Sequence, residues 1–279
     1  MILEPEIFKI EEVIPESTQA KSFIFRGRID YQPGQFIMVW VPRLDEKPFS
    51  ISYHGEDFFG ITVALKGRFT QRLHQVKKGD SLGIRGPFGQ AFNLQACSEH
   101  NESNGPTCVV GGGIGMASLA VLIERLKMSA LGGSASGGPV IVQGARTESE
   151  LLYRTRFKDM MLYTEDGSAG RRGLVTDPLE DMQWRHGFKA LYTCGPEGMM
   201  VKVFEFARRN RIPLQASLER YIKCAIGLCG QCSCNGLRLC IDGPVVNAET
   251  LATLEDFGRF ARLRNSQRVT IEEYLKGCA

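Results

Sequence analysis

The sequence predicts a multi-domain β plus α/β protein: an antiparallel β-barrel, a parallel-sheet α/β domain and a small C-terminal cysteine segment. Three observations support this prediction. Short β-rich runs separated by turn signals fill residues 1–98, and apolar strands alternate with helical patterns over 99–212. Five of the nine cysteines then lie between residues 224 and 240. We expect a cysteine domain at 213–247 and a polar tail at 248–279.

Length and composition are those of an ordinary globular protein. The chain has 279 residues, of which 43% are hydrophobic and 23% are charged, so a core of normal size is available. A formal net charge of +3 with dispersed basic residues argues against a nucleic-acid partner. No run approaches the roughly 18 apolar residues of a membrane span, and the first residues lack a signal-peptide layout. We therefore expect a cytoplasmic protein with no membrane span.

The β-rich part shows its strands as short runs of Phe, Ile and Val at residues 22–25, 35–41 and 60–65. Turn signals separate these runs at Pro33-Gly34 and at residues 54–57 and 78–80. Many short strands at this spacing favour a barrel or a sandwich. One short helix is expected near residues 70–76.

The α/β part begins after Pro106, where the hydrophobic pattern changes. Buried strands are expected at residues 107–110, 139–143 and 188–193, and helices at 117–126, 148–158 and 197–210. Strands that alternate with helices indicate a parallel sheet. The small, polar run at 129–138 is expected to be an exposed loop.

The cysteine cluster requires a metal or redox explanation, because five cysteines crowd into 17 positions. The spacing is Cys224-x4-Cys229-x2-Cys232, followed by Cys240. This opening matches the C-x4-C-x2-C pattern of plant-type [2Fe–2S] sites. Gly227 and Gly230 give the loop the freedom to turn backbone N–H groups toward the sulfurs.

Other interpretations of the cysteines are weaker. Disulfides are disfavoured in a reducing cytosol. Structural zinc prefers paired C-x2–4-C knuckles, and only Cys229-x2-Cys232 forms a good one. Inert buried cysteines would not gather so closely. Cys234 is left over, because its use in place of Cys232 would stretch the middle spacing, so we predict that it is not a ligand.

Two motifs in the β-rich part suit a flavin. Lys47-Pro48-Phe49-Ser50 offers a cation for a pyrophosphate, an aromatic ring for stacking and a hydroxyl for the flavin N5 or O4. Gly67-Arg-Phe-Thr70 precedes the expected short helix and would allow a phosphate to approach its N-terminus. Each motif is also ordinary on its own, since Pro-Phe-Ser occurs in many strands and Gly-x-x-Thr is a common turn and N-cap.

Two glycine motifs lie in the α/β part. Residues 111–115, Gly-Gly-Gly-Ile-Gly, follow a strand and precede a helix, which is the placement that seats a phosphate on backbone amides. The loop is not a full G-x-G-x-x-G, because Met116 stands at the third glycine position. Cys194-Gly-Pro-Glu-Gly198 also joins a strand to a helix, where the cysteine could lie beside a nicotinamide or the motif could be a simple turn.

The order of these four motifs resembles the ferredoxin–NADP reductase superfamily. Within it, the segment from Glu219 to Val245 resembles the electron-transfer subunits of NAD-linked dihydroorotate dehydrogenases. This resemblance covers roughly residues 5–247. It implies an FAD-binding barrel, a nucleotide-binding domain for NAD(H) and a [2Fe–2S] cluster. It also implies an FMN-containing dihydroorotate dehydrogenase catalytic subunit as partner, in a heterotetramer of two of each, which converts dihydroorotate to orotate in pyrimidine biosynthesis.

The resemblance assigns site residues motif by motif. The cluster ligands would be Cys224, Cys229, Cys232 and Cys240. FAD would be contacted by Lys47, Pro48, Phe49, Ser50, Thr62, Val63, Ala64, Phe69 and Thr70. The nicotinamide side would be formed by Gly112, Gly113, Cys194, Gly195, Pro196 and Glu197. No catalytic residue is assigned, and we expect no dihydroorotate oxidation by this chain alone.

The chain departs from the family pattern at three motif positions. Lys47 replaces a commoner arginine and offers phosphate a point charge instead of a bidentate fork. Phe49 cannot donate the hydrogen bond that a tyrosine gives in the wider superfamily. Ser118 stands where a proline often follows the glycine loop. Two other functions stay open at this stage: a subunit of an NAD(P)H-linked sulfide dehydrogenase or electron-bifurcating transhydrogenase, and a zinc-stabilised binding module.

Overall fold

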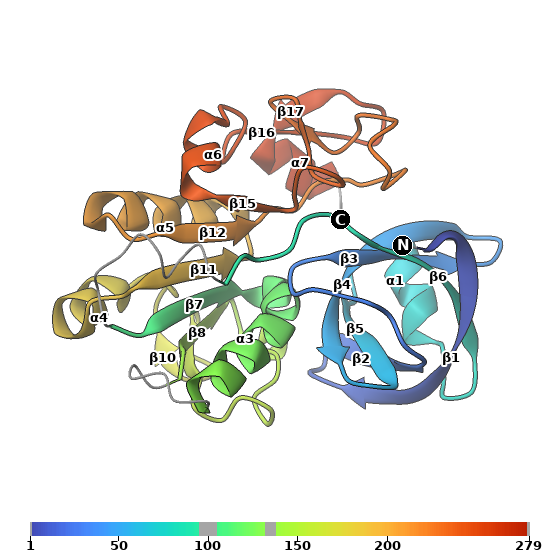
Figure 1. Cartoon of the computed structure of the whole chain (residues 1–279), viewed down its shortest axis with the longest axis horizontal. Coiled ribbons are helices and arrows are strands. Elements are labelled where there is room, and N and C mark those ends of the chain that lie inside the picture. Colours follow the sequence, from blue (N-terminus) through green and yellow to red (C-terminus); the bar gives the residue numbers. More distant parts are fainter. Residues whose placement is uncertain (1, 95–104, 132–137, 278–279) are drawn as a thin grey trace.

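The computed structural model describes residues 2–94, 105–131 and 138–277 (Figure 1). Its first part is a closed barrel whose strands neighbour one another in the order β1-β2-β5-β4-β3-β6, every pair antiparallel. This confirms the barrel and excludes the sandwich. The short helix α1 (Arg68–His74) follows β5 close to its predicted position. The strands are β1 (Ile2–Pro15), β2 (Ala20–Arg26), β3 (Phe36–Val41), β4 (Asp45–His54), β5 (Phe58–Ala64) and β6 (Ser81–Phe88).

Strand β5 shows how the barrel separates its two faces. Ile61 and Val63 point inward and are fully buried in the barrel core. Thr62 points to the opposite face, because side chains alternate along a strand. On that face its hydroxyl lies 2.5 Å from the Tyr153 hydroxyl of the next domain. The outer face of the barrel is therefore where the two parts of the chain meet.

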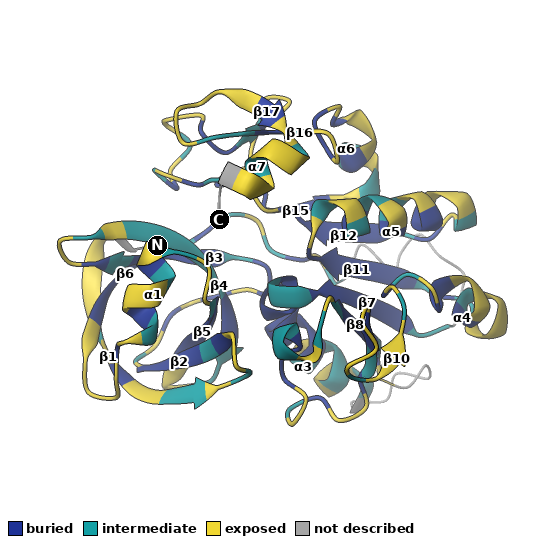
Figure 2. Cartoon of the chain, turned by 180° about the vertical axis from the view of Figure 1, so that it is seen from behind, coloured by how far each residue is buried: buried dark blue, intermediate teal, exposed yellow. Residues whose placement is uncertain are grey.

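The second part is an α/β domain built on a seven-stranded sheet of order β10-β9-β8-β7-β11-β12-β15. All its strands are parallel except β15, which pairs antiparallel with β12. Figure 2 shows the central strands buried, while the outer turns of α4 and α5 are exposed. The strands are β7 (Thr107–Gly112), β8 (Val140–Ala145), β9 (Met161–Thr164), β10 (Arg171–Arg172), β11 (Ala190–Cys194), β12 (Leu214–Ser217) and β15 (Val245–Asn247).

Three helices accompany this sheet: α3 (Met116–Leu131), α4 (Leu179–His186) and α5 (Glu197–Asn210). Helices α3 and α5 confirm two predicted helices. Helix α3 continues to Leu131 and so overlaps the start of the loop predicted at 129–138, and residues 132–137 lie outside the described part of the chain.

The prediction of a helix at residues 148–158 is wrong. Only a 3-10 turn, Glu148–Glu150, forms there, and the chain then runs irregularly. Tyr153 adopts a positive φ of 57° with its side chain buried. This backbone conformation interrupts a helix and directs the ring between the two domains. The apolar residues that suggested a helical stripe are buried individually by an irregular segment.

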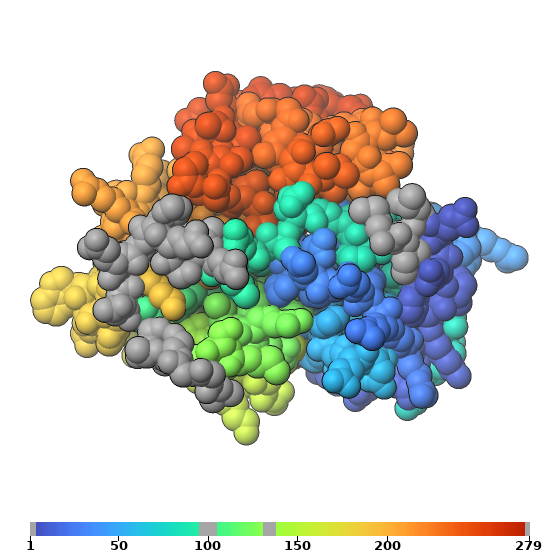
Figure 3. Space-filling model, in the orientation of Figure 1, coloured from blue at the N-terminus to red at the C-terminus, as the bar shows by residue number. Residues whose placement is uncertain are grey.

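The C-terminal part lies across the other two, shown in orange and red in Figure 1. It contains the hairpin β13 (Ser233–Cys234) and β14 (Leu237–Arg238), helix α6 (Ala248–Thr253), the hairpin β16 (Phe260–Arg262) and β17 (Arg268–Thr270), and α7 (Ile271–Gly277). In the space-filling view its atoms abut both the barrel and the α/β domain (Figure 3). The polar tail thus folds back, and Gln231 donates to the Leu263 carbonyl at 2.5 Å.

No helix in the described ranges is long and apolar enough to cross a membrane.

Candidate functional site

The cysteine loop is an irregular segment that turns its backbone amides toward sulfur. Ala225, Gly227 and Gly230 all have positive φ angles, between 64° and 74°. In this conformation the Gly227 amide donates to Cys240 Sγ at 3.2 Å and the Cys229 amide donates to Cys224 Sγ at 3.4 Å. Gly227 therefore turns its backbone amide toward a cysteine sulfur, as predicted. Ala225 was not foreseen, because alanine rarely adopts this backbone region.

Four thiols converge as two neighbouring pairs. The Cys229 thiol is a close neighbour of Cys224, the Cys232 thiol is a close neighbour of Cys240, and Cys224 also acts electrostatically on Cys240. Among the described residues, no three His, Cys, Asp or Glu side chains gather around one point as the ligands of a single ion do. A [2Fe–2S] cluster takes four cysteines across two irons. The donor set and its two-pair arrangement fit that cluster.

The two pairs differ in their electrostatic surroundings. Burial opposes ionisation of Cys224, but hydrogen bonds from the backbone amides of Cys229 and Ile226 outweigh it and lower the pKa of the thiol to about 7. Burial and the neighbouring Cys232 thiol raise the pKa of Cys240 to about 12. Thiolates are the form that binds metal. Cys224, on the surface side of the loop, is therefore expected to ionise at a lower pH than Cys240 on the buried side.

Cys234 lies apart from these four thiols. Its sulfur is buried and accepts a hydrogen bond from Arg220 Nη2 at 3.7 Å. Its electrostatic neighbours are Arg220, Glu197 and Asp256, and none of the other cysteines is among them. Burial raises the pKa of this thiol. The Cys234 sulfur therefore belongs to a buried network with Arg220 and Glu197.

Glu197 corrects one expectation about the nicotinamide side. Its carboxylate accepts both guanidinium nitrogens of Arg220, at 2.6 and 2.7 Å, and also the Gly258 amide at 2.7 Å. Both charged side chains are buried. The carboxylate faces the cysteine segment, so only the backbone of Glu197 can face a nucleotide. This buried ion pair joins the start of α5 to the residues that lead into the cysteine loop.

The two glycine motifs lie against each other at the carboxyl edge of the parallel sheet. Strands β7 and β11 are paired, and both motifs follow directly from them. A Cβ atom on Gly195 would lie 2.8 Å from the Gly112 Cα, and one on Gly112 would lie 2.6 Å from Pro196 Cδ. Gly113 has a φ of 50° and open space around it. Dinucleotides bind at this edge of such sheets.

On the barrel side, the first motif lies along β4. The Phe49 and Phe69 rings stack with centroids 6.1 Å apart. Lys47 Nζ lies 2.6 Å from Asp45 and 5.0 Å from the centre of the Tyr221 ring. Pro48 pairs with Met38 across the barrel sheet, and Ala64 ends β5 half-buried. An aromatic pair, a cation and the Ser50 hydroxyl therefore lie on neighbouring elements, as a flavin dinucleotide requires.

Three of the residues expected to contact FAD have their side chains engaged elsewhere. Thr62 shares hydrogen bonds with Ser22 and Ser52, both at 2.7 Å, and with Tyr153. Val63 packs into the barrel core. The Thr70 hydroxyl caps α1, accepting from the Lys66 and Gly67 amides and donating to the Gly67 carbonyl. A cofactor could meet these three residues only through their backbone.

Glu219 is a residue that the sequence reasoning missed. It follows β12 by two residues, at the same carboxyl edge as the two glycine loops. Its side chain is exposed, and its charged neighbours are Lys66, Glu197 and Arg220. Its charge also acts on Cys194. The sequence feature that could have identified Glu219 is its position just after a buried parallel strand.

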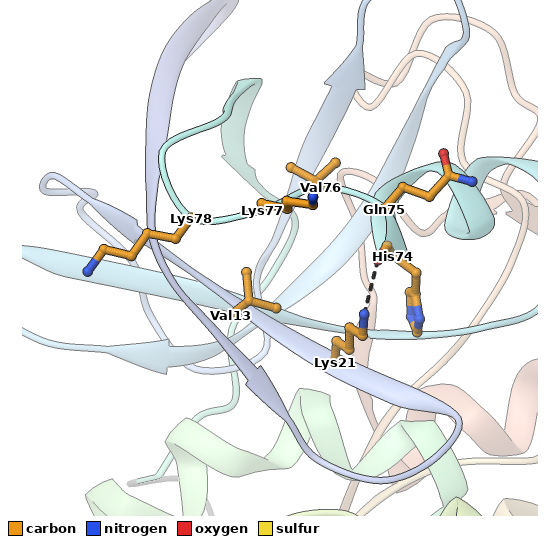
Figure 4. A pocket seen from close by; sticks show the side chains of 7 residues that line it. All are labelled: Val13, Lys21, His74, Gln75, Val76, Lys77 and Lys78. Carbon is orange, nitrogen blue, oxygen red and sulfur yellow. Dashed lines mark hydrogen bonds between the residues drawn. The ribbon is translucent and has the colours of Figure 1, made fainter.

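A cavity of about 460 Å³ lies away from this site, on the barrel beyond the end of α1 (Figure 4). Within it, Lys21 Nζ donates to the His74 carbonyl at 3.0 Å. None of the predicted site residues lines the cavity, so it plays no part in the assignment. Its lining is Val13, Lys21, His74, Gln75, Val76, Lys77 and Lys78.

A closed antiparallel barrel joined to a parallel sheet, with glycine loops at the carboxyl edge and a cysteine segment beside both, defines a flavin-linked reductase of the ferredoxin–NADP reductase class. A solved structure described as an NADH-dependent reduced ferredoxin-NADP oxidoreductase, studied for flavin-based electron bifurcation, superimposes with a TM-score of 0.73. It is 25% identical in sequence, and the match covers 88% of this chain and 89% of that one.

Comparison with sequence relatives identifies the family to which the chain belongs within this class. The family model for the iron-sulfur cluster binding domain of dihydroorotate dehydrogenase B matches residues 219–252. A Methanocaldococcus jannaschii protein is 36% identical over 95% of this chain and 98% of its own length, and one from Methanothermobacter thermautotrophicus is 38% identical over 95% and 97%. Both are described as probable electron transfer subunits of dihydroorotate dehydrogenase B (NAD(+)). The chain belongs to this family of electron-transfer subunits.

Proposed function

We propose that this chain passes electrons between NAD(H), FAD and a [2Fe–2S] cluster, to or from an FMN-containing catalytic subunit that converts dihydroorotate to orotate. The observation that carries the proposal is the position of the cysteine loop between the other two parts. Tyr221, just before the loop, accepts a hydrogen bond from Lys47 of the barrel at 3.4 Å. Arg220 beside it holds Glu197 of the α/β domain. One short segment therefore touches both candidate cofactor sites.

The residues divide the work among three sites. Cys224, Cys229, Cys232 and Cys240 hold the cluster, and Lys47, Phe49, Ser50 and Phe69 supply the side-chain contacts to FAD. The two glycine loops bind NAD(H) through their backbone. The bound flavin supplies the chemistry that links two-electron hydride exchange with NAD(H) to one-electron exchange with the cluster. The domains at 1–98, 99–212 and 213–247 correspond to these sites, and the tail at 248–279 supports the third.

The partner docks, in this proposal, on the exposed side of the cysteine loop. Ile226 and Leu228 are 46% and 82% exposed there, between two cysteines of the proposed ligand set. Large aliphatic side chains that stand in solvent beside a redox centre suit a protein partner that covers them. The partner is the FMN-containing catalytic subunit, and we propose two copies of each chain in a cytoplasmic complex.

The test uses the purified chain with and without its partner. Alone, it should oxidise NADH with an artificial dye as acceptor and should leave dihydroorotate unchanged. Addition of the catalytic subunit should link dihydroorotate oxidation to NAD⁺ reduction. A chain that carries no flavin absorbance and oxidises no NADH would contradict the proposal.

One other function draws support from a specific observation, the structural match to the NADH-dependent ferredoxin-NADP oxidoreductase. In that case the partner would be a large FAD-bearing subunit. Isolation of the native complex separates the two functions, because the flavin of the co-purified partner is FMN in one and FAD in the other.

A further inference from the structure

Ser118 departs from the family pattern, and its hydroxyl occupies the junction between the two cofactor sites. It lies in the first turn of α3, directly after the glycine loop, and only 7% of the residue is exposed. The residue often found at this position, proline, has no hydroxyl. A buried hydroxyl needs hydrogen-bond partners, so the partners of Ser118 show what it does.

Those partners come from two different domains. Ser118 Oγ lies 2.7 Å from Ser50 Oγ on β4 of the barrel. Its surroundings also include the Cys194 thiol at the end of β11, which Ser217 of the paired strand β12 adjoins. Ser50 belongs to the motif proposed to meet the flavin, and Cys194 to the loop proposed to face the nicotinamide. Ser118 is therefore a direct link between the two sides across which hydride must pass.

The hydrogens and lone pairs of Ser50, Ser118 and Cys194 determine what Ser118 can control. Each hydroxyl carries one hydrogen and two acceptor lone pairs, and a thiol can both donate and accept. Since either serine can donate in the pair, Ser118 decides whether Ser50 presents a hydrogen or a lone pair to the cleft. Burial raises the pKa of Cys194 to about 12, so its thiol stays protonated and can complete the chain in either direction.

We propose that Ser118 is a positioning residue that orients the Ser50 hydroxyl against the flavin ring and fixes it relative to Cys194 beside the nicotinamide. This inference rests on the proposed function and adds a residue to the same site. Hydride transfer depends strongly on the geometry of the reacting groups. We therefore expect the Ser118 hydroxyl, which lies between the barrel and the α/β domain, to affect the rate of hydride transfer more than the affinity for the nucleotide.

The experiment compares Ser118→Ala with the wild-type flavoprotein by rapid mixing with NADH. Ser129→Ala is the matched control, because Ser129 lies on the same helix and its hydroxyl donates to the Arg125 carbonyl of the preceding turn. Removal of one hydrogen bond should lower the rate constant for flavin reduction roughly three- to tenfold. The NADH concentration at half-saturation should stay unchanged, and the visible absorption band of the bound flavin should shift.

A double-mutant cycle with Ser50→Ala tests the route of the effect. If Ser118 acts through Ser50, Ser118→Ala should change the rate less than about twofold in the Ser50→Ala background. A wild-type rate and spectrum in Ser118→Ala, or the same loss in both backgrounds, would overturn the inference. A wild-type chain that binds no flavin, or whose flavin NADH does not reduce, would overturn the proposed function instead.

Discussion

Cys232 and Cys234 are two residues apart, yet the structure gives their thiols different neighbours. Cys232 is beside Cys240, whereas Cys234 accepts a hydrogen bond from Arg220 in a separate buried network. The spacing already favoured Cys232 as the ligand. Only the fold shows what Cys234 does instead, because the Arg220 partner Glu197 lies far away in the sequence.

The cysteine assignment predicts opposite outcomes for two similar variants. Cys232→Ala should lose the cluster, because three thiols cannot complete a site that needs four. Cys234→Ala should keep it. Iron content per chain and the visible cluster absorbance measure the difference, with the flavin content as internal control. Loss of iron from Cys234→Ala at normal flavin content would place Cys234 among the ligands.

The shifted pKa values of the thiols predict a pH-dependent order of alkylation in the cluster-free protein. A thiolate reacts and a thiol does not, so a lowered pKa makes Cys224 reactive from near pH 7 upward. Cys240, with its pKa raised to about 12, should resist until strongly alkaline pH. Peptide mapping after iodoacetamide treatment at several pH values reads both sites. Equal labelling of the two at pH 7.5 would contradict the proposed backbone hydrogen bonding.

At the scale of elements, hydrophobic periodicity predicted what long regular segments do. Helices α3 and α5 and strands β7, β8 and β11 lie close to their predicted positions, because each buries one continuous face or run. The helix predicted at 148–158 does not form, because that segment buries no continuous face. Its apolar residues fill separate gaps between the domains, and the left-handed Tyr153 leaves no sequence signature.

The paired glycine loops predict a strong effect from one added methyl group. Gly195 has a φ of 155°, and a Cβ there would meet the Gly112 backbone at 2.8 Å, so Gly195→Ala must displace one loop. The NADH concentration at half-saturation should rise about tenfold or more, as for the loss of a well-placed binding contact. FAD content should stay unchanged.

The control for this change is Gly198→Ala, three residues on in helix α5, where a Cβ meets nothing within 4 Å. Its NADH dependence should match the wild type, and alanine should favour the helix slightly. A similar rise in both variants would show that the paired glycine loops are not the nucleotide site.

At the scale of the whole molecule, the cysteine segment and the tail hold the other two parts together. Arg264 of the tail donates to Asp45 of the barrel at 2.9 Å and to the Tyr221 hydroxyl at 3.1 Å. The order of motifs predicted which sites the chain contains. It could not predict this closure, nor the buried ion pair of Glu197 with Arg220, because long-range contacts between polar residues follow no local pattern.

The exposed face of the cysteine loop predicts a separable effect on partner binding. Leu228→Asp places a charge on the proposed docking surface without touching a buried contact, since Leu228 is 82% exposed. Affinity for the catalytic subunit should fall at least tenfold, as for loss of a central apolar contact. NADH–dye activity should stay at the wild-type level. Asn265→Asp, an exposed polar substitution in the tail, serves as the control.

We propose that this one chain carries electrons from NADH through a flavin to an iron–sulfur cluster. The most direct measurement is an anaerobic titration with NADH of the purified protein after metal, sulfide and flavin analysis. We predict iron and sulfide in the ratio of a [2Fe–2S] cluster, one FAD per chain, and reduction of both the flavin and the cluster by NADH. Zinc in place of iron, or a flavin that NADH reduces while the cluster stays oxidised, would contradict the account.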